Sequence, residues 1–84
     1  MINIRIYCPK NHKEFETTHE VVKKAFLKHN LECRIYSITS EDIIYQTHIN
    51  LLPHIVINNQ VVYCGSCPKD SEMDLILKRM HLIK

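Results

Sequence analysis

Hydrophobic and polar residues alternate at two places in the first half of the chain, and this period of two is typical of β-strands. The alternation predicts one strand over residues 2–7 and a second over residues 33–38. Between these strands, apolar residues recur at helical spacing, namely Phe15, Val22, Ala25 and Phe26. This spacing predicts a helix over residues 11–29, and Asn30 suits the position just past its end.

The clearest local pattern of the chain is a β-hairpin. Residues 54–57 and 60–63 are rich in β-branched residues, and the pair Asn58–Asn59 separates them. Asparagine tolerates a positive φ better than any other residue except glycine, so the pair suits a two-residue hairpin turn. Such a turn fixes the cross-strand pairs, which we expect to be Ile57–Gln60, Val56–Val61, Ile55–Val62 and His54–Tyr63, with Cys64 next to Pro53.

Two further helices complete the chain. Residues 39–42 carry the signals of a helix start, and Ile43 and Ile44 are expected on the inner face of the short helix that follows. The last helix is expected after Pro68, with Ser71 as a plausible N-cap. Its apolar stripe consists of Met73, Ile76, Leu77 and Met80. The order β-α-β-α-β-β-α predicts an α/β fold, a single domain over residues 1–84, with parallel strands joined by crossover helices.

This order, with a proline directly before the hairpin, resembles the thioredoxin-like fold over nearly the whole chain. The segment from Leu51 to Val62, LLPHIVINNQVV, is similar to the corresponding segment of glutaredoxins and of small archaeal and bacterial thioredoxin-like proteins. The resemblance implies a four-stranded mixed sheet flanked by helices. It also implies a cis peptide before Pro53 beside the active site, where Leu52, Pro53, His54 and Gly65 would contact the substrate.

The chain departs from that family at its usual dithiol. The family places Cys-x-x-Cys between the first strand and the first helix, whereas this chain has Cys8-Pro9-Lys10-Asn11-His12 there. If Cys8 is the nucleophile, this segment is a monothiol version of the family motif, because Asn11 stands at the second cysteine position. If the chain is aligned with the family by its first helix instead, the motif falls a few residues later, where the chain has no cysteine. The paired glycine and acid of glutaredoxins appear only as Gly65 and, farther on, Asp70, which argues against glutathione use.

Composition and charge exclude several classes of function. The net charge of +2 is small and the basic residues are spread along the chain, so we expect no nucleic-acid partner. The single glycine excludes a glycine-rich phosphate loop. No segment approaches about 18 consecutive apolar residues, and no signal peptide is recognisable, so we expect no membrane partner and a cytoplasmic protein.

The four cysteines carry the candidate chemistry. Cys64-Gly65-Ser66-Cys67 is the only Cys-x-x-Cys of the chain, and the fold is expected to bring Cys8 and Pro53 to the same end of the sheet. Cys33, at the opposite end, is expected to be structural, since free cysteine is among the most buried residue types. A simpler interpretation makes Cys64 and Cys67 two ordinary reduced cysteines in a loop.

Three converging sulfurs predict a thiol–disulfide redox protein acting on a protein disulfide or a small thiol. Cys8, at a helix N-terminus near lysines, would be a nucleophile with a depressed pKa, and Cys64 and Cys67 would be the dithiol or the resolving thiols. An alternative is a zinc or iron–sulfur site made by the same sulfurs, with His12 or His54 as a further ligand. For His54, packing against Tyr63 across the hairpin is a competing role. The third reading is a redox-inactive thioredoxin-like domain that binds a protein partner.

Overall fold

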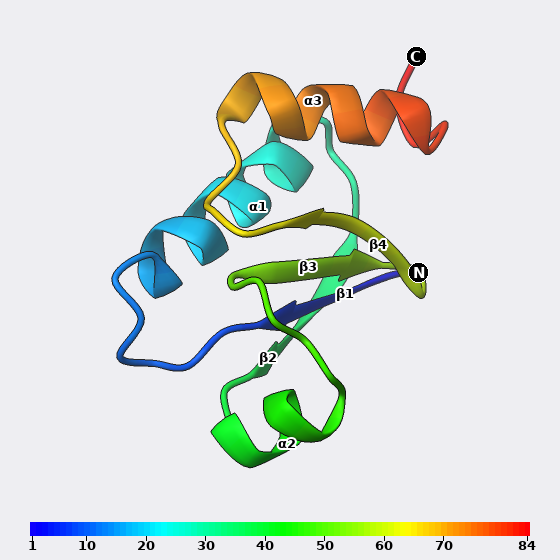
Figure 1. Ribbon diagram of the computed structural model, residues 1–84. Coiled ribbons are helices and arrows are strands. Elements are labelled where there is room, and N and C mark those ends of the chain that lie inside the picture. The colour runs from blue at the N-terminus through cyan, green and yellow to red at the C-terminus, as the bar shows by residue number, and fades with distance from the viewer.

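The computed structural model describes residues 1–84 and has the predicted element order, β-α-β-α-β-β-α. The elements are β1 (Ile2–Tyr7), α1 (Phe15–Lys28), β2 (Cys33–Ile38), α2 (Glu41–Gln46), β3 (His54–Ile57), β4 (Gln60–Cys64) and α3 (Asp70–Arg79). The four strands form one mixed sheet in the order β2-β1-β3-β4. β1 and β2 are parallel, whereas β3 runs antiparallel to both β1 and β4. Helices α1 and α3 cover one face of the sheet and α2 covers part of the other (Figure 1).

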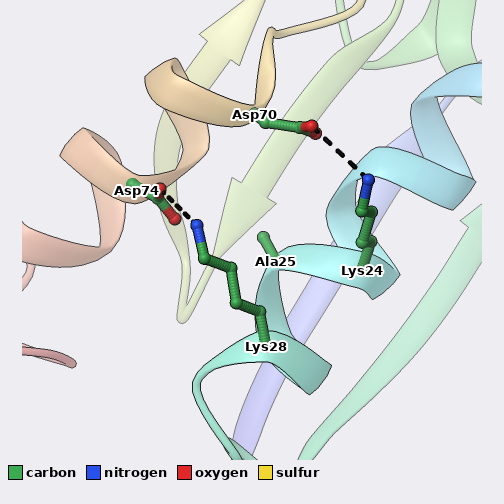
Figure 2. Close-up of a pocket in the computed structure, with 5 residues that line it drawn as sticks. All are labelled: Lys24, Ala25, Lys28, Asp70 and Asp74. Carbon is green, nitrogen blue, oxygen red and sulfur yellow. Dashed lines mark hydrogen bonds and ion pairs between the residues drawn. The ribbon is translucent and has the colours of Figure 1, made fainter.

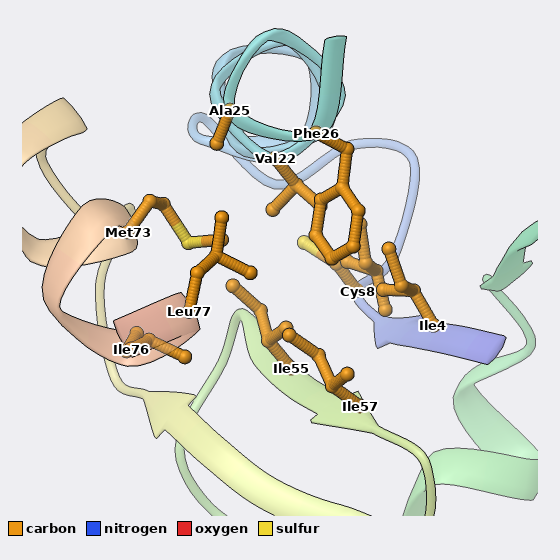
Figure 3. Packing of buried hydrophobic residues seen from close by; sticks show 11 residues of the cluster. Ile4, Cys8, Val22, Ala25, Phe26, Ile55, Ile57, Met73, Ile76 and Leu77 are labelled. Carbon is orange, nitrogen blue, oxygen red and sulfur yellow. The ribbon is translucent and has the colours of Figure 1, made fainter. Parts of the chain in front are cut away.

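The main core lies between the sheet and the α1–α3 pair. Because side chains alternate along a strand, Ile4 and Ile6 of β1 point to the same face as Ile55 and Ile57 of β3, and all four are fully buried. The helices contribute the predicted stripes to this cluster, which are Val22, Ala25 and Phe26 from α1 and Met73, Ile76 and Leu77 from α3 (Figure 3). The periodicity of the sequence therefore located the larger core correctly.

A smaller core lies on the other face, under α2. Tyr7, Ile44 and Val56 are buried there, and Leu52 packs against them. Ile43 is an exception to the sequence prediction, because it is 49% exposed and only Ile44 faces the sheet. A helix of six residues has room for one buried side chain on each turn, so two adjacent isoleucines do not both face inward.

The helix C-termini follow one local rule. Asn30, His48 and His81 each stand just past a helix end with a positive φ of 56–60°. After α1, the N–H of Asn30 donates to Leu27 O and the N–H of Leu31 to Phe26 O, which satisfies carbonyls that the helix leaves free. The prediction for Asn30 is thus confirmed.

The helix N-termini differ from the prediction. α1 begins at Phe15 rather than at residue 11, because the N–H of His12 donates to Pro9 O and the N–H of Phe15 donates to His12 O, so turns fill this segment. The N-cap of α3 is Lys69 rather than Ser71, because the Glu72 carboxylate accepts the Lys69 N–H at 2.9 Å.

Ion pairs line a surface pocket at the seam between α1 and α3 (Figure 2). Lys24 Nζ lies 3.6 Å from Asp70 Oδ2, and Lys28 Nζ lies 2.9 Å from Asp74 Oδ2. His29 Nε2 lies 2.9 Å from the other oxygen of Asp74. These groups are in contact with solvent, so each pair adds little to the stability of the fold. No helix of the structure has the length and apolar character needed to cross a membrane.

Candidate functional site

Cys8 belongs to the main core. Its side chain is fully buried, and its sulfur points under α1 toward Val22 and Phe26 (Figure 3). Its backbone N–H donates to Ile38 O at 3.0 Å, which continues the β1–β2 pairing by one residue. Burial, and then the negative charge of Glu14, raise the pKa of the Cys8 thiol.

The prediction that Cys8 is a nucleophile at a helix N-terminus is therefore wrong. Six residues separate Cys8 from the first residue of α1, and the field of a helix dipole falls off within its first turn. The pKa of Cys8 is raised rather than depressed, so this thiol stays protonated at neutral pH.

His12 has a local structural role instead of the ligand role considered from the sequence. Its Nδ1 accepts a hydrogen bond from the Glu14 backbone N–H at 3.1 Å. This nitrogen is therefore occupied by the backbone and is not free to bind a metal ion. His12 thereby fixes the turn that precedes α1 and orients Glu14.

The hairpin register differs from the prediction at its open end. Val56–Val61 and Ile57–Gln60 pair as expected, but a β-bulge follows, in which Val62 has no partner. Ile55 then pairs with Tyr63, and His54 pairs with Cys64. The turn itself is as predicted, since Asn58 and Asn59 have φ of 48° and 67°.

The bulge decides which face of the sheet Cys64 occupies. A shift of one residue moves every later side chain of a strand to the opposite face. Without the bulge, the Cys64 side chain would lie on the same face of the sheet as Cys8. With the bulge, it lies on the same face as its cross-strand partner His54. The His54 ring in turn packs edge-on against Tyr7 of β1, with ring centroids 5.8 Å apart, and not against Tyr63. Cys8 and Cys64 therefore lie on opposite faces of the sheet.

Cys64 is exposed and lines an open groove on the α2 side, which we call the Cys64 groove. Its lining residues are Thr47, His48, Ile49, Asn50, Leu51, His54 and Cys64. Burial lowers the pKa of His54, and its Nδ1 is buried without a hydrogen-bond partner. The groove thus combines an exposed thiol with a neutral imidazole.

The residues expected to contact a substrate lie at the rim of this groove or beneath it. The Leu52–Pro53 peptide bond is cis, and Pro53 itself is fully buried. The carbonyl oxygen of Pro53 accepts the N–H of Gly65 at 3.0 Å, so Gly65 takes the place next to Pro53 that the unbulged register gives to Cys64. Leu52 packs into the small core, which leaves Leu51, 57% exposed, as the accessible apolar residue.

Cys67 lies half-buried on the opposite side of the sheet end, against α1. Its backbone N–H donates to Glu14 Oε2 at 3.0 Å, and its sulfur lies within 3.4 Å of Pro68 O. Burial is the largest cause of the raised pKa of its thiol, and the acids Glu14, Asp70 and Glu72 act in the same direction. The Thr18 hydroxyl beside the sulfur acts in the opposite direction and lowers the pKa.

The structure does not form the metal site that the sequence left as an alternative. No group of three or more histidine, cysteine or acidic side chains is arranged to hold a metal ion. The set Cys8, Cys64, Cys67 and His12 is separated because Cys8 is in the core, Cys64 is on the other face and His12 Nδ1 binds Glu14. These residues do not fit zinc or an iron–sulfur cluster. Cys33 pairs with Ile2 at the far end of the sheet and packs against the main core.

Two residues of this region had no signal in the sequence. Glu14 looks like one of several acids before a helix, yet it contacts the loop that carries Cys67. Thr18 is a polar residue on the inner face of α1, and it is fully buried beside Cys67. Contacts between residues about 50 positions apart in the chain follow from the fold and not from spacing.

The architecture is a thioredoxin-like fold, with a mixed four-stranded sheet between α1 and α3 on one face and α2 on the other. The family model of the thioredoxin domain matches residues 2–78, so the chain belongs to the thioredoxin domain family. No curated protein matches the chain significantly.

Solved structures show the same fold at low sequence identity. A malarial protein has a TM-score of 0.71 at 11% identity, with 99% of each chain covered. A designed protein has a TM-score of 0.64 at 16% identity, covering 99% of this chain and 78% of its own. Oxidised thioredoxin from Plasmodium falciparum has a TM-score of 0.63 at 8% identity, covering 94% of this chain and 80% of its own.

Proposed function

We propose that this chain is a small thiol–disulfide redox protein that uses Cys64 and Cys67 as its dithiol. The observation that carries the proposal is the placement of two free thiols three residues apart at one end of the sheet. Cys64 is exposed to an incoming substrate, and Cys67 follows it in a segment that belongs to no helix or strand. Membership of the thioredoxin domain family supports a thiol redox role.

The reaction divides between the two sulfurs. The Cys64 thiolate attacks one sulfur of a substrate disulfide, forms a mixed disulfide with it and releases the other sulfur as a thiolate. The Cys67 thiol then loses its proton and attacks the Cys64 sulfur, which releases the second substrate thiolate and leaves a Cys64–Cys67 disulfide. Two electrons pass from the dithiol to the substrate, and an external thiol reductant restores the dithiol. Loop residues 65–69 rearrange to bring the two sulfurs together.

The different surroundings of the two thiols support this order. Cys64 is exposed, whereas burial and nearby acids raise the pKa of Cys67 and keep it a thiol at neutral pH. The His54 imidazole, which burial keeps neutral, lines the same groove as Cys64. Cys8 has no part in the reaction because its side chain is sealed in the core.

The substrate is a protein disulfide or a small disulfide that enters the Cys64 groove, with Leu51 as its apolar contact. The reaction needs no metal, resident cofactor, nucleic acid or membrane, and glutathione enters only as one small thiol among others. Four free thiols suit a reducing compartment such as the cytoplasm.

Single serine variants test the proposal with a low-molecular-weight disulfide as substrate. Cys67→Ser is expected to accumulate a mixed disulfide on Cys64, visible in the intact mass, and Cys64→Ser is expected to lose reduction of the substrate. Cys33→Ser is the matched control, since Cys33 lies at the far end of the sheet and should leave the rate unchanged. The proposal is wrong if the wild type reduces no disulfide, or if the Cys67→Ser variant turns over without an adduct.

One observation favours a second candidate, a redox-inactive domain that binds a protein partner. Where the family carries its dithiol, between β1 and α1, this chain has only the sealed Cys8. A double variant, Cys64→Ser with Cys67→Ser, separates the two: a cellular phenotype that survives it selects the binding domain, and one that disappears selects the redox protein.

A further inference from the structure

Glu14 joins two segments of the chain that meet only through folding. It stands directly before α1, and its Oε2 accepts the backbone N–H of Cys67, 53 positions away, at 3.0 Å. Glu14 is itself held in place, because its own N–H donates to His12 Nδ1 and its carbonyl oxygen accepts the N–H of Thr18. The carboxylate is therefore a fixed anchor for the loop between β4 and α3.

The same carboxylate lies among the groups that surround the Cys67 sulfur. Glu14 belongs to the α1 side of the sulfur, Asp70 and Glu72 to the α3 side, and Tyr63 to β4. The acids disfavour a negative charge on the sulfur, whereas the fully buried Thr18 beside it favours that charge. The Thr18 hydroxyl is buried and forms no hydrogen bond in the structure.

We propose that Glu14 is the positioning residue of this thiol site: its carboxylate binds the loop that carries Cys67 to the start of α1 and places a negative charge beside that sulfur until the loop is released. The proposal rests on the proposed role of Cys67 as resolving thiol. In this arrangement Cys67 does not compete with Cys64 for the substrate. Once a mixed disulfide forms on Cys64 and the loop rearranges, the N–H of residue 67 leaves Glu14 and the sulfur moves away from the carboxylate.

Two substitutions separate the charge of Glu14 from its hydrogen bond. Glu14→Gln removes the charge but leaves an amide oxygen that accepts the Cys67 N–H, and Glu14→Ala removes both. Glu16→Gln is the matched control, because Glu16 lies in the first turn of the same helix, is exposed and has no contact with the loop. Alkylation of Cys67 by iodoacetamide is followed across pH by peptide mass spectrometry, and the exchange of its amide hydrogen is measured in parallel.

In Glu14→Gln, we expect Cys67 to be alkylated about threefold or more faster at neutral pH than in the wild type, with its pH profile shifted to lower pH, because the thiolate is the reactive form. Its amide protection should persist in Glu14→Gln and fall in Glu14→Ala, and Glu16→Gln should match the wild type in both measurements. Alkylation of Cys33 reports whether each variant stays folded.

An unchanged pH profile in Glu14→Gln, or unchanged amide protection in Glu14→Ala, would overturn the role of Glu14. Neither measurement requires a disulfide substrate. If the variants behave as expected but the wild type reduces no disulfide, the proposed function fails while the role of Glu14 in holding Cys67 stands. If reduction occurs and the Cys67 profile is insensitive to Glu14, only the role of Glu14 fails.

Discussion

Replacing Cys8 tests whether this thiol stabilises the core or takes part in redox chemistry. The side chain is fully buried in the main core, beneath Val22 and Phe26. Cys8→Ala removes a buried group about the size of one or two methylenes and leaves a small cavity, so we expect a loss of about 1–2 kcal/mol of unfolding free energy. Cys8→Ser keeps the volume but buries a hydroxyl without a partner, which costs about 1–3 kcal/mol.

Both variants should still fold. At typical per-residue values, a chain of 84 residues has an unfolding free energy of about 4–12 kcal/mol. Each kilocalorie lost lowers Tm by roughly 4–8 °C in a domain of this size. The assay is urea and thermal unfolding of the reduced protein followed by far-UV circular dichroism, with disulfide reduction measured separately on the folded variants. We expect reduced stability and an unchanged rate of reduction.

The pH dependence gives a second readout for Cys8. Burial and the Glu14 charge raise its pKa in the folded protein, so the folded state binds the thiol proton more tightly than the unfolded state. The resulting stability is present below the unfolded pKa of a thiol, about 8.5, and is lost as the pH rises through the higher folded value. Cys8→Ala should lose stability less steeply than the wild type above that pH. Variants as stable as the wild type that no longer reduce disulfides would refute the burial argument.

Two further substitutions probe the surroundings of the site. Gly65→Ala should cost about 1–2 kcal/mol in urea unfolding, because Gly65 has a φ of 96°; the added Cβ would meet Leu51 only at an ordinary 3.8 Å, so the cost comes from the backbone. Asp74→Asn should make Tm fall less steeply below about pH 5. Hydrogen bonds, first from His29, lower the pKa of Asp74 in the folded protein. The stability that Asp74 contributes is therefore present above its unfolded pKa and is lost as the pH falls through its folded pKa. Asp42→Asn, in the exposed start of α2, is the control, and an equally steep acid limb in both variants would contradict the assignment.

Local rules predicted most of the fold. The period-two runs gave β1 and β2 with their observed bounds, and the Asn58–Asn59 turn was correct because two adjacent positive φ values demand such residues. The first residues of the helices were predicted less accurately from the sequence. The first residues expected in α1 form turns that involve Pro9 and His12 instead, and the spacing of apolar residues does not mark these turns.

The candidate site shows why a correct fold did not give a correct cluster of sulfurs. The sequence placed the backbone of Cys8 and of Cys64 at the same end of the sheet, and the pairing of β1 with β3 and of β3 with β4 agrees with that. The direction of the side chains depends on a finer feature, namely whether one strand of the hairpin contains an extra, unpaired residue. Val62 is such a residue, and nothing in a run of β-branched residues marks it as unpaired.

That single bulge places side chains near the end of β4 in two different environments. It moves Tyr63 onto the main-core side, where its hydroxyl donates to Glu72 at 2.8 Å, and it moves Cys64 to the α2 side beside His54. Because Cys67 returns to the α1 side, the two thiols of the Cys-x-x-Cys are presented to different surroundings, one open and one half-buried among acids. In the proposed dithiol this difference would set a fixed order of reaction, because Cys64 is exposed whereas Cys67 is half-buried in a loop that is bound to Glu14.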